Sequence, residues 1–270
     1  MTIVRSSDRH DRLNRYARRM RAATALLLLF LAACSRGDAG APGPVSPCRE
    51  QAFEGAHFTV CTPGAGKLML IAAAKQEAPL RTFAEVGRTV GFDKVSFAMN
   101  AGMFDEHGRP IGLAIADGKE KHAVNRRKGG GNFHLMPNGV FIVRKSGKAA
   151  IVATNGYTRS DTIETATQSG PMLVIDGKLH PAFEPDGASR LIRNGVGVRS
   201  GQALFVISQE PVSFGKFARF FRDAMKTPNA LYLDGSVSSL WDPANGRQDA
   251  HVSLGPILVV FKPEASTPDP

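Results

Sequence analysis

The stretch Val95-Ser-Phe-Ala-Met-Asn-Ala-Gly-Met-Phe104 joins a short apolar, β-prone run to an Asn-Ala-Gly turn. Similar blocks, each with a polar residue beside glycine, recur at wide spacing: Gln168-Ser-Gly-Pro-Met172, Arg193-Asn-Gly-Val-Gly197 and Leu233-Asp-Gly-Ser-Val-Ser238. Apolar runs adjoin three of the four blocks, which places their polar residues where strands end and the chain turns sharply. Glycine at such a position lets the backbone approach a ligand closely. The blocks therefore predict a domain of short strands with polar groups at the strand ends.

Further β-prone runs are separated by Gly, Asn and Asp along the rest of the chain. The expected strands are Val95–Met99, Gly112–Ala116, Gly139–Val143, Ala150–Ala153, Met172–Ile175, Val196–Arg199, Ala203–Ile207, Leu231–Leu233 and Gly255–Phe261. Phe58–Cys61 and Leu68–Ala73 are expected to form a hairpin around Pro63-Gly-Ala-Gly66, since glycine supplies the positive φ angles of tight turns. This patterning is typical of mostly antiparallel sheet.

Two segments have helical spacing instead. Leu80–Val90 carries an apolar stripe and is followed by Gly91, a common helix stop. A second helix is expected from Ser213 or Phe214 to Met225, because its phenylalanines fall at helical spacing and Pro228 blocks extension. We therefore expect an α+β fold, a single domain of mostly antiparallel sheet with a few helices.

The N-terminus carries a second signal, one of export. Three arginines at positions 18, 19 and 21 precede the apolar run Ala22–Leu31, and Leu31-Ala-Ala-Cys34 follows. A basic region, a short apolar core and small residues before cysteine predict a secretory signal, and the ending resembles a bacterial lipobox with a lipid on Cys34. The run is too short for a permanent membrane span. Met20 would begin a signal of more usual length, so the translation start stays open between Met1 and Met20.

The N-terminal signal and the composition of the two termini indicate the domain organisation. Residues 1–33 are predicted to be a lipoprotein signal peptide, 34–47 a flexible tether rich in Gly, Ala, Pro and Ser, 48–262 one folded domain and 263–270 an unstructured tail. A location in the cell envelope follows, with the chain anchored to the membrane on the periplasmic side. Ser35 after the lipid cysteine favours the outer membrane over the inner one.

Charge and cysteines restrict the partners. The whole chain has a net charge of +10, but half of this excess lies in the export signal, and the remainder is spread out without a basic helix or interleaved aromatic residues. Nucleic acid is therefore not an expected partner. With Cys34 lipidated, Cys48 and Cys61 are expected to pair as a disulfide in an oxidising compartment.

Together with Pro110-Ile-Gly-Leu113, Gly131-Asn-Phe133, Pro137-Asn-Gly-Val-Phe141 and Asn229-Ala-Leu-Tyr-Leu-Asp234, the four blocks resemble the phosphodiester glycosidase family in their order and spacing. The resemblance covers roughly Gly91–Lys262 and is strongest to the compact bacterial branch. It implies hydrolysis of the bond from a sugar's anomeric carbon to a phosphodiester, with N-acetylglucosamine as the sugar of the family, and a glycan phosphodiester as the substrate.

Candidate catalytic groups are carboxylates, because a departing phosphate monoester needs little protonation and the main task is to stabilise oxocarbenium-like charge. Asp234 is the leading candidate, since it ends an apolar strand and the family carries Leu-Asp-Gly there; its alternative role is a strand-end turn or helix cap. Glu210, after the strand Ala203–Ile207, is the second candidate, and a surface turn is its alternative. Ser236-Val237 replaces further glycines of the family, which leaves the substrate's shape open.

Substrate-binding candidates accompany these carboxylates. Arg193 is expected to clamp phosphate through bidentate guanidinium contacts, as the family's arginine at this position implies, and Arg190 is the less favoured neighbour. The residues expected to hydrogen-bond or accommodate the sugar and phosphate are Asn100, Gln168, Ser169, Gly235 and Ser238. Each could also be a satisfied turn residue. The basic, glycine-rich segment 125–131 could grip phosphate, although an exposed loop is the more common outcome.

Other site types find less support. The scattered histidines lack zinc-ligand spacing, and no Gly-x-Ser-x-Gly elbow marks a serine hydrolase. No cofactor is expected, and a divalent metal is left open. Two rival functions remain: a phosphodiesterase that breaks phosphorus–oxygen bonds, with or without a divalent metal at Asp234 and its neighbours, and a glycan-binding lipoprotein without turnover.

Overall fold

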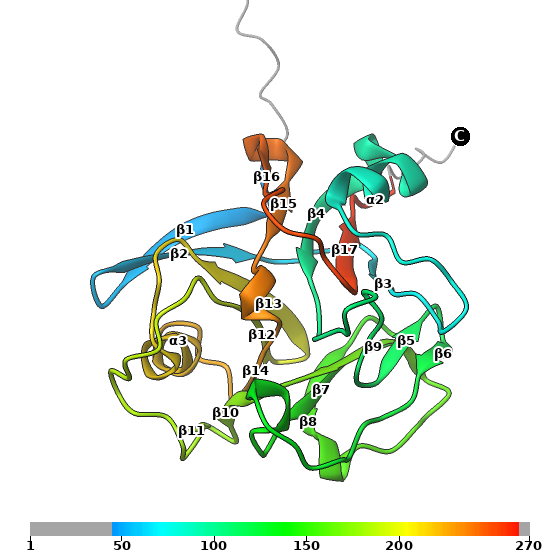
Figure 1. The fold of residues 1–270 in the computed structure, drawn as a ribbon. Coiled ribbons are helices and arrows are strands. Elements are labelled where there is room, and N and C mark those ends of the chain that lie inside the picture. The colour runs from blue at the N-terminus through cyan, green and yellow to red at the C-terminus, as the bar shows by residue number, and fades with distance from the viewer. Residues whose placement is uncertain (1–44, 265–270) are drawn as a thin grey trace, which may run out of the picture. The chain divides into compact units, whose positions relative to one another are not determined.

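The structure, a computed structural model, describes residues 45–264, which form one compact unit. Three antiparallel sheets make up most of it, with short helices on their surfaces (Figure 1). The predicted signal peptide, Cys34 and most of the tether lie outside the described residues. The expected fold class, α+β with mostly antiparallel sheet in a single domain, is confirmed.

The largest sheet has seven strands, all paired antiparallel. Their order across the sheet is β1 (Cys48–Phe53), β2 (Ala56–Cys61), β13 (Gln202–Ser208), β12 (Asn194–Arg199), β14 (Asn229–Tyr232), β10 (Met172–Ile175) and β11 (Lys178–Leu179). On one face of this sheet pack α3 (Phe214–Arg219) and the π-helical turn η4 (Phe220–Ala224), through buried Phe217, Phe220 and Phe221. The phenylalanines of the second expected helix therefore belong to the core.

Two five-stranded sheets complete the domain. One has the order β16 (Arg247–Gln248), β15 (Leu240–Asp242), β4 (Val95–Asn100), β17 (Ile257–Phe261) and β3 (Leu68–Ile71). The other has the order β6 (Lys119–His122), β5 (Ala114–Ala116), β9 (Ile163–Ser169), β7 (Gly139–Arg144) and β8 (Ala149–Ala153).

The main core lies where the three sheets meet. Phe205 of the large sheet is fully buried and makes edge-to-face contacts with Phe97 of β4 and Phe141 of β7, each at a centroid distance of 5.7 Å. Aromatic pairs in this geometry add to the free energy gained by burying their area. One ring thus links all three sheets.

The first helix, α2 (Phe83–Val90), begins three residues later than Leu80 because Thr82 caps it. Thr82 Oγ1 accepts from the backbone N–H of Glu85, and the Glu85 carboxylate accepts from the backbone N–H of Thr82. This reciprocal capping box satisfies two donors that the first turn leaves free. Short 3-10 turns are η1 (Phe92–Lys94), η2 (Asn132–His134), η3 (Thr154–Gly156), η5 (Gly235–Val237) and η6 (Pro243–Asn245).

The expected hairpin of Phe58–Cys61 with Leu68–Ala73 is wrong. β2 pairs with β1 and β13, whereas β3 pairs with β17 in another sheet. The hairpin partner of β2 is β1, joined by Glu54 and Gly55, both with positive φ, as two-residue hairpin turns require. Strands β1, β6, β9, β11, β15 and β16 were not among the expected ones.

Cys48 and Cys61 form the expected disulfide, between the first residue of β1 and its direct partner at the end of β2. The bond closes the N-terminal hairpin where the chain enters the domain. In residues 45–264, no helix has the length and apolar character needed to cross a membrane.

Candidate active site

Three strand ends from two sheets meet at one edge of the domain. β4 ends at Asn100 and β12 begins at Asn194. Leu233, the residue after β14, donates its backbone N–H to the backbone oxygen of Asn194. Asp234 follows directly, and its backbone N–H donates to Ala101 O over 3.1 Å. The polar–glycine blocks at residues 100, 193 and 233 are thus brought together from positions far apart in the sequence.

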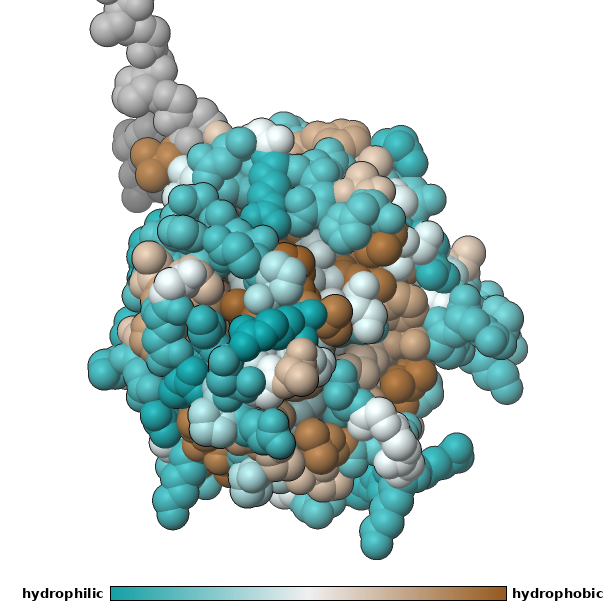
Figure 2. All heavy atoms as spheres, turned by 60° about the vertical axis from the view of Figure 1, so that its left-hand side comes forward, coloured by the Kyte–Doolittle hydropathy of each residue, from teal (hydrophilic) through white to brown (hydrophobic). Residues whose placement is uncertain are grey.

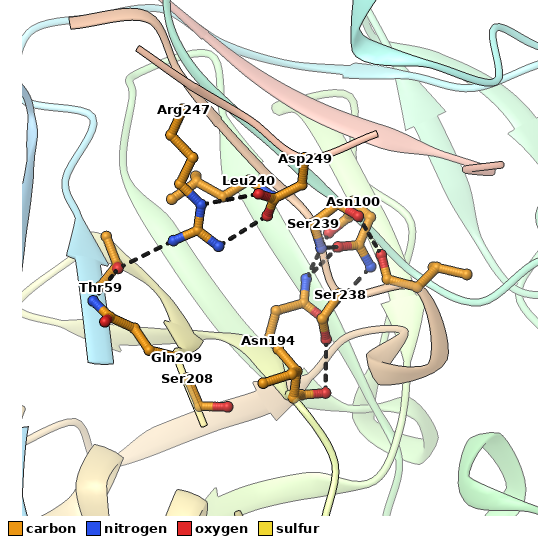
Figure 3. A network of polar contacts seen from close by, with 12 residues as sticks. Thr59, Asn100, Asn194, Ser208, Gln209, Ser238, Ser239, Leu240, Arg247 and Asp249 are labelled. Atoms are coloured by element: carbon orange, nitrogen blue, oxygen red, sulfur yellow. Dashed lines mark hydrogen bonds and ion pairs between the residues drawn. The ribbon is translucent and has the colours of Figure 1, made fainter. Parts of the chain in front are cut away.

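Asn100 and Asn194 form a buried amide pair at this junction (Figure 3). Asn194 Nδ2 donates to Asn100 Oδ1 over 2.9 Å, and Asn100 Nδ2 donates to the backbone oxygen of Asp234 over 2.8 Å. Asn100 Oδ1 also accepts from Ser239 N. Asn100 therefore holds both ends of the segment 234–239, and its amide is occupied by the protein rather than open to a ligand.

Ser238 supports the same segment from within. Its hydroxyl lies within hydrogen-bond distance of Asn194 Oδ1 and of the backbone oxygens of Ile192 and Gly235, at 3.1–3.2 Å. The side chain is buried. Predicted as substrate ligands, Asn100 and Ser238 are placed by the structure in the framework that carries Asp234; a direct substrate contact stays a prediction.

Asp234 is half-buried at the start of η5. Its Oδ1 accepts from the backbone N–H of Ser236 over 3.2 Å, while Oδ2 has no hydrogen-bond donor among the described residues. Burial raises the pKa of Asp234, and the Ser236 hydrogen bond offsets only part of that effect. A carboxylate with a raised pKa and a free oxygen can exchange a proton or attack a substrate.

Gly235 is required by what lies beneath it. A Cβ at this position would collide with the hydroxyl of Tyr232, the last residue of β14. Tyr232 is buried, and its hydroxyl accepts from Arg193 Nη1 over 3.2 Å. The absence of a side chain at Gly235 therefore lets Asp234 sit directly above a buried Arg–Tyr pair.

Arg193 is fully buried in this layer, away from any surface where phosphate could reach it directly. Its guanidinium donates from Nε to Val212 O over 2.8 Å and from Nη2 to Ser189 O over 2.9 Å, and it stacks 3.7 Å from the centroid of the Phe214 ring. Desolvation lowers the pKa of Arg193. The contacts make it an internal support; a role as phosphate clamp stays a prediction that would need these contacts to open.

Glu210 leaves the large sheet at the same edge as Asp234. Strand β12 separates β13 from β14, so the chains at Ile207 and Leu233 are about 10 Å apart. Glu210 is partly exposed and binds His57, whose Nδ1 lies 2.7 Å from Oε1 and whose backbone N–H donates to Oε2. These hydrogen bonds lower the pKa of Glu210 and raise that of His57. No hydrogen bond of the described residues joins Glu210 to Asp234, and its catalytic role stays a prediction.

Gln168 and Ser169 lie at the end of β9 and are buried. The Gln168 oxygen accepts from Leu113 N and Asn125 N, and its amide nitrogen donates to Asn125 O and Thr154 Oγ1. All of its hydrogen-bonding capacity thus serves to hold two loops. Ser169 Oγ has no partner within the described residues. Sugar binding by either residue stays a prediction.

A second polar group borders the amide pair and was missed at the sequence level (Figure 3). Arg247 donates from Nη2 to Asp249 over 2.8 Å, and Asp249 accepts from Leu240 N, one residue after Ser239. Arg247 Nη1 also reaches Thr59 Oγ1 at 3.4 Å. Neither residue lies in a glycine block, so only their proximity in the fold indicates a link to the site.

Comparison with known proteins decides the family. Residues 93–260 match the family model of phosphodiester glycosidases. The chain belongs to the phosphodiester glycosidase family. It is 41% identical over 149 residues to the uncharacterized protein YigE of Escherichia coli K12, a match that covers 55% of this chain and 58% of YigE. The chain thus spans little more than half the length of this curated relative.

Solved structures share the fold at low sequence identity. The catalytic domain of zebrafish N-acetylglucosamine-1-phosphodiester alpha-N-acetylglucosaminidase, auto-inhibited by its pro-peptide, matches with a TM-score of 0.56 and 16% identity over 80% of this chain and 82% of that one. A hypothetical protein from Synechocystis matches with a TM-score of 0.52 and 15% identity, covering 79% and 61%. A putative exported protein from Burkholderia pseudomallei matches with a TM-score of 0.50 and 12% identity, covering 77% and 74%.

A hollow of about 570 Å³ is lined in part by Pro110 and Ile111, from the block Pro110-Ile-Gly-Leu113. Its lining includes Arg126, Arg127, Lys128, two histidines and one carboxylate, Asp105, whose Oδ1 accepts from the backbone N–H groups of His107 and Arg109. A series of contacts links this hollow to the segment after β4: Gly102 packs against the Gln168 backbone, and the Gln168 amide holds Asn125, which lines the hollow. The buried Gln168 amide therefore fixes the start of the basic segment 125–131, whose residues 126–131 are exposed.

Figure 2 shows a face on which hydrophilic residues cover most of the surface and hydrophobic residues form small separate groups. Within residues 45–264, no group of three His, Cys, Asp or Glu residues has an arrangement that could hold a metal ion.

Proposed function

We propose that this protein is an envelope hydrolase that breaks the bond between the anomeric carbon of a sugar and a phosphodiester oxygen. Water supplies the new oxygen, so the products are the free sugar and a phosphomonoester. The observation that carries the proposal is Asp234: a half-buried carboxylate with a raised pKa and a free Oδ2, on a segment that three hydrogen bonds tie to the Asn100–Asn194 pair. Membership of the phosphodiester glycosidase family supports the reaction type.

Asp234 acts in its ionised form, either by attacking the anomeric carbon or by taking a proton from the attacking water. Both routes place negative charge next to the positive charge that develops on the sugar. The phosphomonoester leaves with the bonding electrons and needs little protonation, so a strong general acid is dispensable. Glu210 is the candidate for a second carboxylate, and its lowered pKa keeps it ionised.

The substrate phosphate is held by the basic side chains of the hollow beside Asn125. Arg127 and Lys128 are exposed and form no ion pair with a described carboxylate. Guanidinium and ammonium groups bind phosphate oxygens strongly when no internal carboxylate competes. We assign phosphate binding to Arg127 and Lys128 because the Arg193 guanidinium is buried and already donates to Val212 and Ser189.

The test is to incubate the purified protein with an N-acetylglucosamine phosphodiester and to identify the products by phosphorus and proton NMR, with and without a chelator. Free sugar plus phosphomonoester is expected. Sugar phosphate plus alcohol would move the reaction to phosphorus, and chelator sensitivity would favour that rival. Binding without product would favour a glycan-binding role.

Matched variants locate the chemistry. D234N should abolish turnover, and D176N, which changes an exposed strand-turn carboxylate, should keep it. Full activity of D234N would overturn the assignment. E210Q decides whether a second carboxylate takes part.

The cellular setting is also a proposal. A lipid on Cys34 would tether the domain to the membrane on the periplasmic side, with Ser35 favouring the outer membrane. Its support is the basic, apolar and small-residue order of residues 18–34. C34S should move the protein from the membrane fraction to the soluble periplasmic fraction. Unchanged fractionation would contradict the anchor.

A further inference from the structure

A second, larger hollow of about 1050 Å³ carries most of the domain's excess positive charge. Residues 45–264 contain 26 Lys and Arg and 20 Asp and Glu, a net charge of +6. The lining of this hollow, here called the basic hollow, holds six of the basic residues and one acidic residue, Glu164. The six are Arg49, Lys67, Arg144, Lys145, Lys148 and Arg199.

These six side chains are exposed, and none forms an ion pair with a carboxylate of the described residues. Like charges held together raise the local positive potential and attract anions. A surface that served only solubility would mix both signs, as the ion pair of Arg219 with Glu54 does elsewhere on the domain. The basic hollow therefore offers unneutralised cations to a ligand.

Backbone contacts hold the walls of the basic hollow in place. Its walls are the connection from β2 to β3, the β7–β8 turn and the β12–β13 turn. The two turns are tied together, because Ala149 N donates to Gly201 O over 2.8 Å. At the third wall Gly66 packs so closely against the backbone oxygen of Phe261 that a Cβ would not fit. Fixed walls reduce the entropy lost on binding.

The basic hollow is a separate place from the Asp234 site. Strand β12 runs from Asn194, in the buried amide pair, to Arg199, in the hollow. Six residues of extended strand span about 17 Å between these two ends. A ligand in the hollow thus binds at the opposite end of β12 from the Asp234 site and leaves Asp234 free.

The chemistry of the lining selects one class of ligand. The volume exceeds what a single phosphate fills, and the lining has no aromatic residue, so it lacks the stacking platform typical of single-stranded nucleic acid sites. A concave wall suits a chain-like ligand better than a flat membrane surface, which would contact only the rim. Six cations around a hollow match anionic groups that repeat along a flexible chain.

We propose that the basic hollow binds an extended glycan chain that carries several phosphodiester groups, and that it retains such a polymer while Asp234 acts on one bond. The sugar part of this ligand rests on the proposed function, whereas the repeating phosphate rests on the charge of the hollow alone. The protein is thereby an enzyme for polymeric rather than small substrates.

The test compares two double variants with the same change in net charge. K145E/K148E reverses charge in the basic hollow, and K75E/K178E reverses two exposed lysines outside it that form no ion pair with a described carboxylate. Binding of inorganic polyphosphate and of a phosphodiester-linked glycan polymer is measured by titration calorimetry at two salt concentrations. K145E/K148E should weaken both affinities by about tenfold or more and reduce the salt dependence, while K75E/K178E should change affinity less than about twofold.

Equal losses in both double variants would mean diffuse attraction and overturn the proposal. Binding to vesicles of phosphatidylcholine and phosphatidylglycerol, with no binding to either polymer, would overturn it in favour of a membrane-docking face. The assay needs no turnover, so a failure of the hollow is separate from a failure of the proposed function. If both hold, K145E/K148E keeps the wild-type rate on a small phosphodiester and loses rate only on the polymer.

Discussion

Asn194 donates from Nδ2 to Oδ1 of Asn100 over 2.9 Å, and this bond joins the first residue of β12 to the last residue of β4. The two strands belong to different sheets. Through Asp234 O and Ser239 N the pair also fixes both ends of the segment that carries the candidate carboxylate. The site thus depends on how two sheets are registered against each other.

Replacing Asn100 by alanine should lower the free energy of unfolding by about 3 kcal/mol, because unpaired buried polar groups cost about 1–3 kcal/mol each. Ser239 N, Asp234 O and the Asn194 amide would all lose a partner. Urea unfolding of N100A measures the effect. N155A changes an exposed asparagine that makes no hydrogen bond to the amide pair and should stay within about 0.5 kcal/mol of the wild type; a similar loss in both variants would show that the pair is not special.

Arg193→Lys distinguishes internal support from phosphate binding. A lysine keeps the charge but cannot reproduce the guanidinium contacts with Val212, Ser189 and the Phe214 ring. R193K should therefore lower the free energy of unfolding by about 2 kcal/mol or more and reduce kcat. R190K, at an exposed arginine paired with Asp186, should do neither. A raised KM with unchanged stability would instead support the phosphate clamp.

The disulfide between Cys48 and Cys61 should stabilise the domain by about 3 kcal/mol in the chain-entropy model. Unfolding in urea with and without a reductant measures this difference. The double variant C48S/C61S should resemble the reduced protein and show no further response to reductant. If reduction left the unfolding midpoint unchanged, the packing of β1 against β2 would be sufficient to hold the hairpin.

The sequence was sufficient for several strands that combine an unbroken apolar run with an adjoining polar–glycine block. β10 has the expected bounds, and β4, β7 and β12 differ from expectation by one or two residues. β9 was missed, although it is a central strand, because its Thr and Gln side chains interrupt the apolar pattern while all lie buried at a sheet interface. The pairing of β2 with β13 could not be foreseen, because local turn chemistry says nothing about contacts 150 residues apart.

At the site, sequence identified which blocks carry polar residues but not which atoms remain free. Arg193 and Gln168 are types of residue that bind phosphate and sugars well, yet their hydrogen bonds are made within the protein. Asn194 stands beside Arg193 in the same block, and its importance emerges only when β4 lies next to it. Burial and hydrogen-bond pairing are properties of the tertiary structure. They distinguish residues that are free to contact a substrate from residues whose polar atoms are used within the protein.

Asp234 should show opposite effects on activity and on stability. Burial raises the pKa of Asp234 in the folded protein above its value in the unfolded chain. The folded state therefore disfavours the ionised carboxylate, and the unfolding free energy falls as the pH rises from the unfolded pKa through the raised folded pKa. D234N removes this cost, so it should match the wild type at low pH and be more stable at neutral pH, while turnover is lost.

Wild-type kcat should rise with pH through the same region, since the ionised form acts. Urea unfolding and kcat, both measured across one pH series, test the stability prediction and the activity prediction. If kcat falls as the pH rises through this region, Asp234 acts as a proton donor. If D234N and the wild type are equally stable at all pH values, the raised pKa is contradicted.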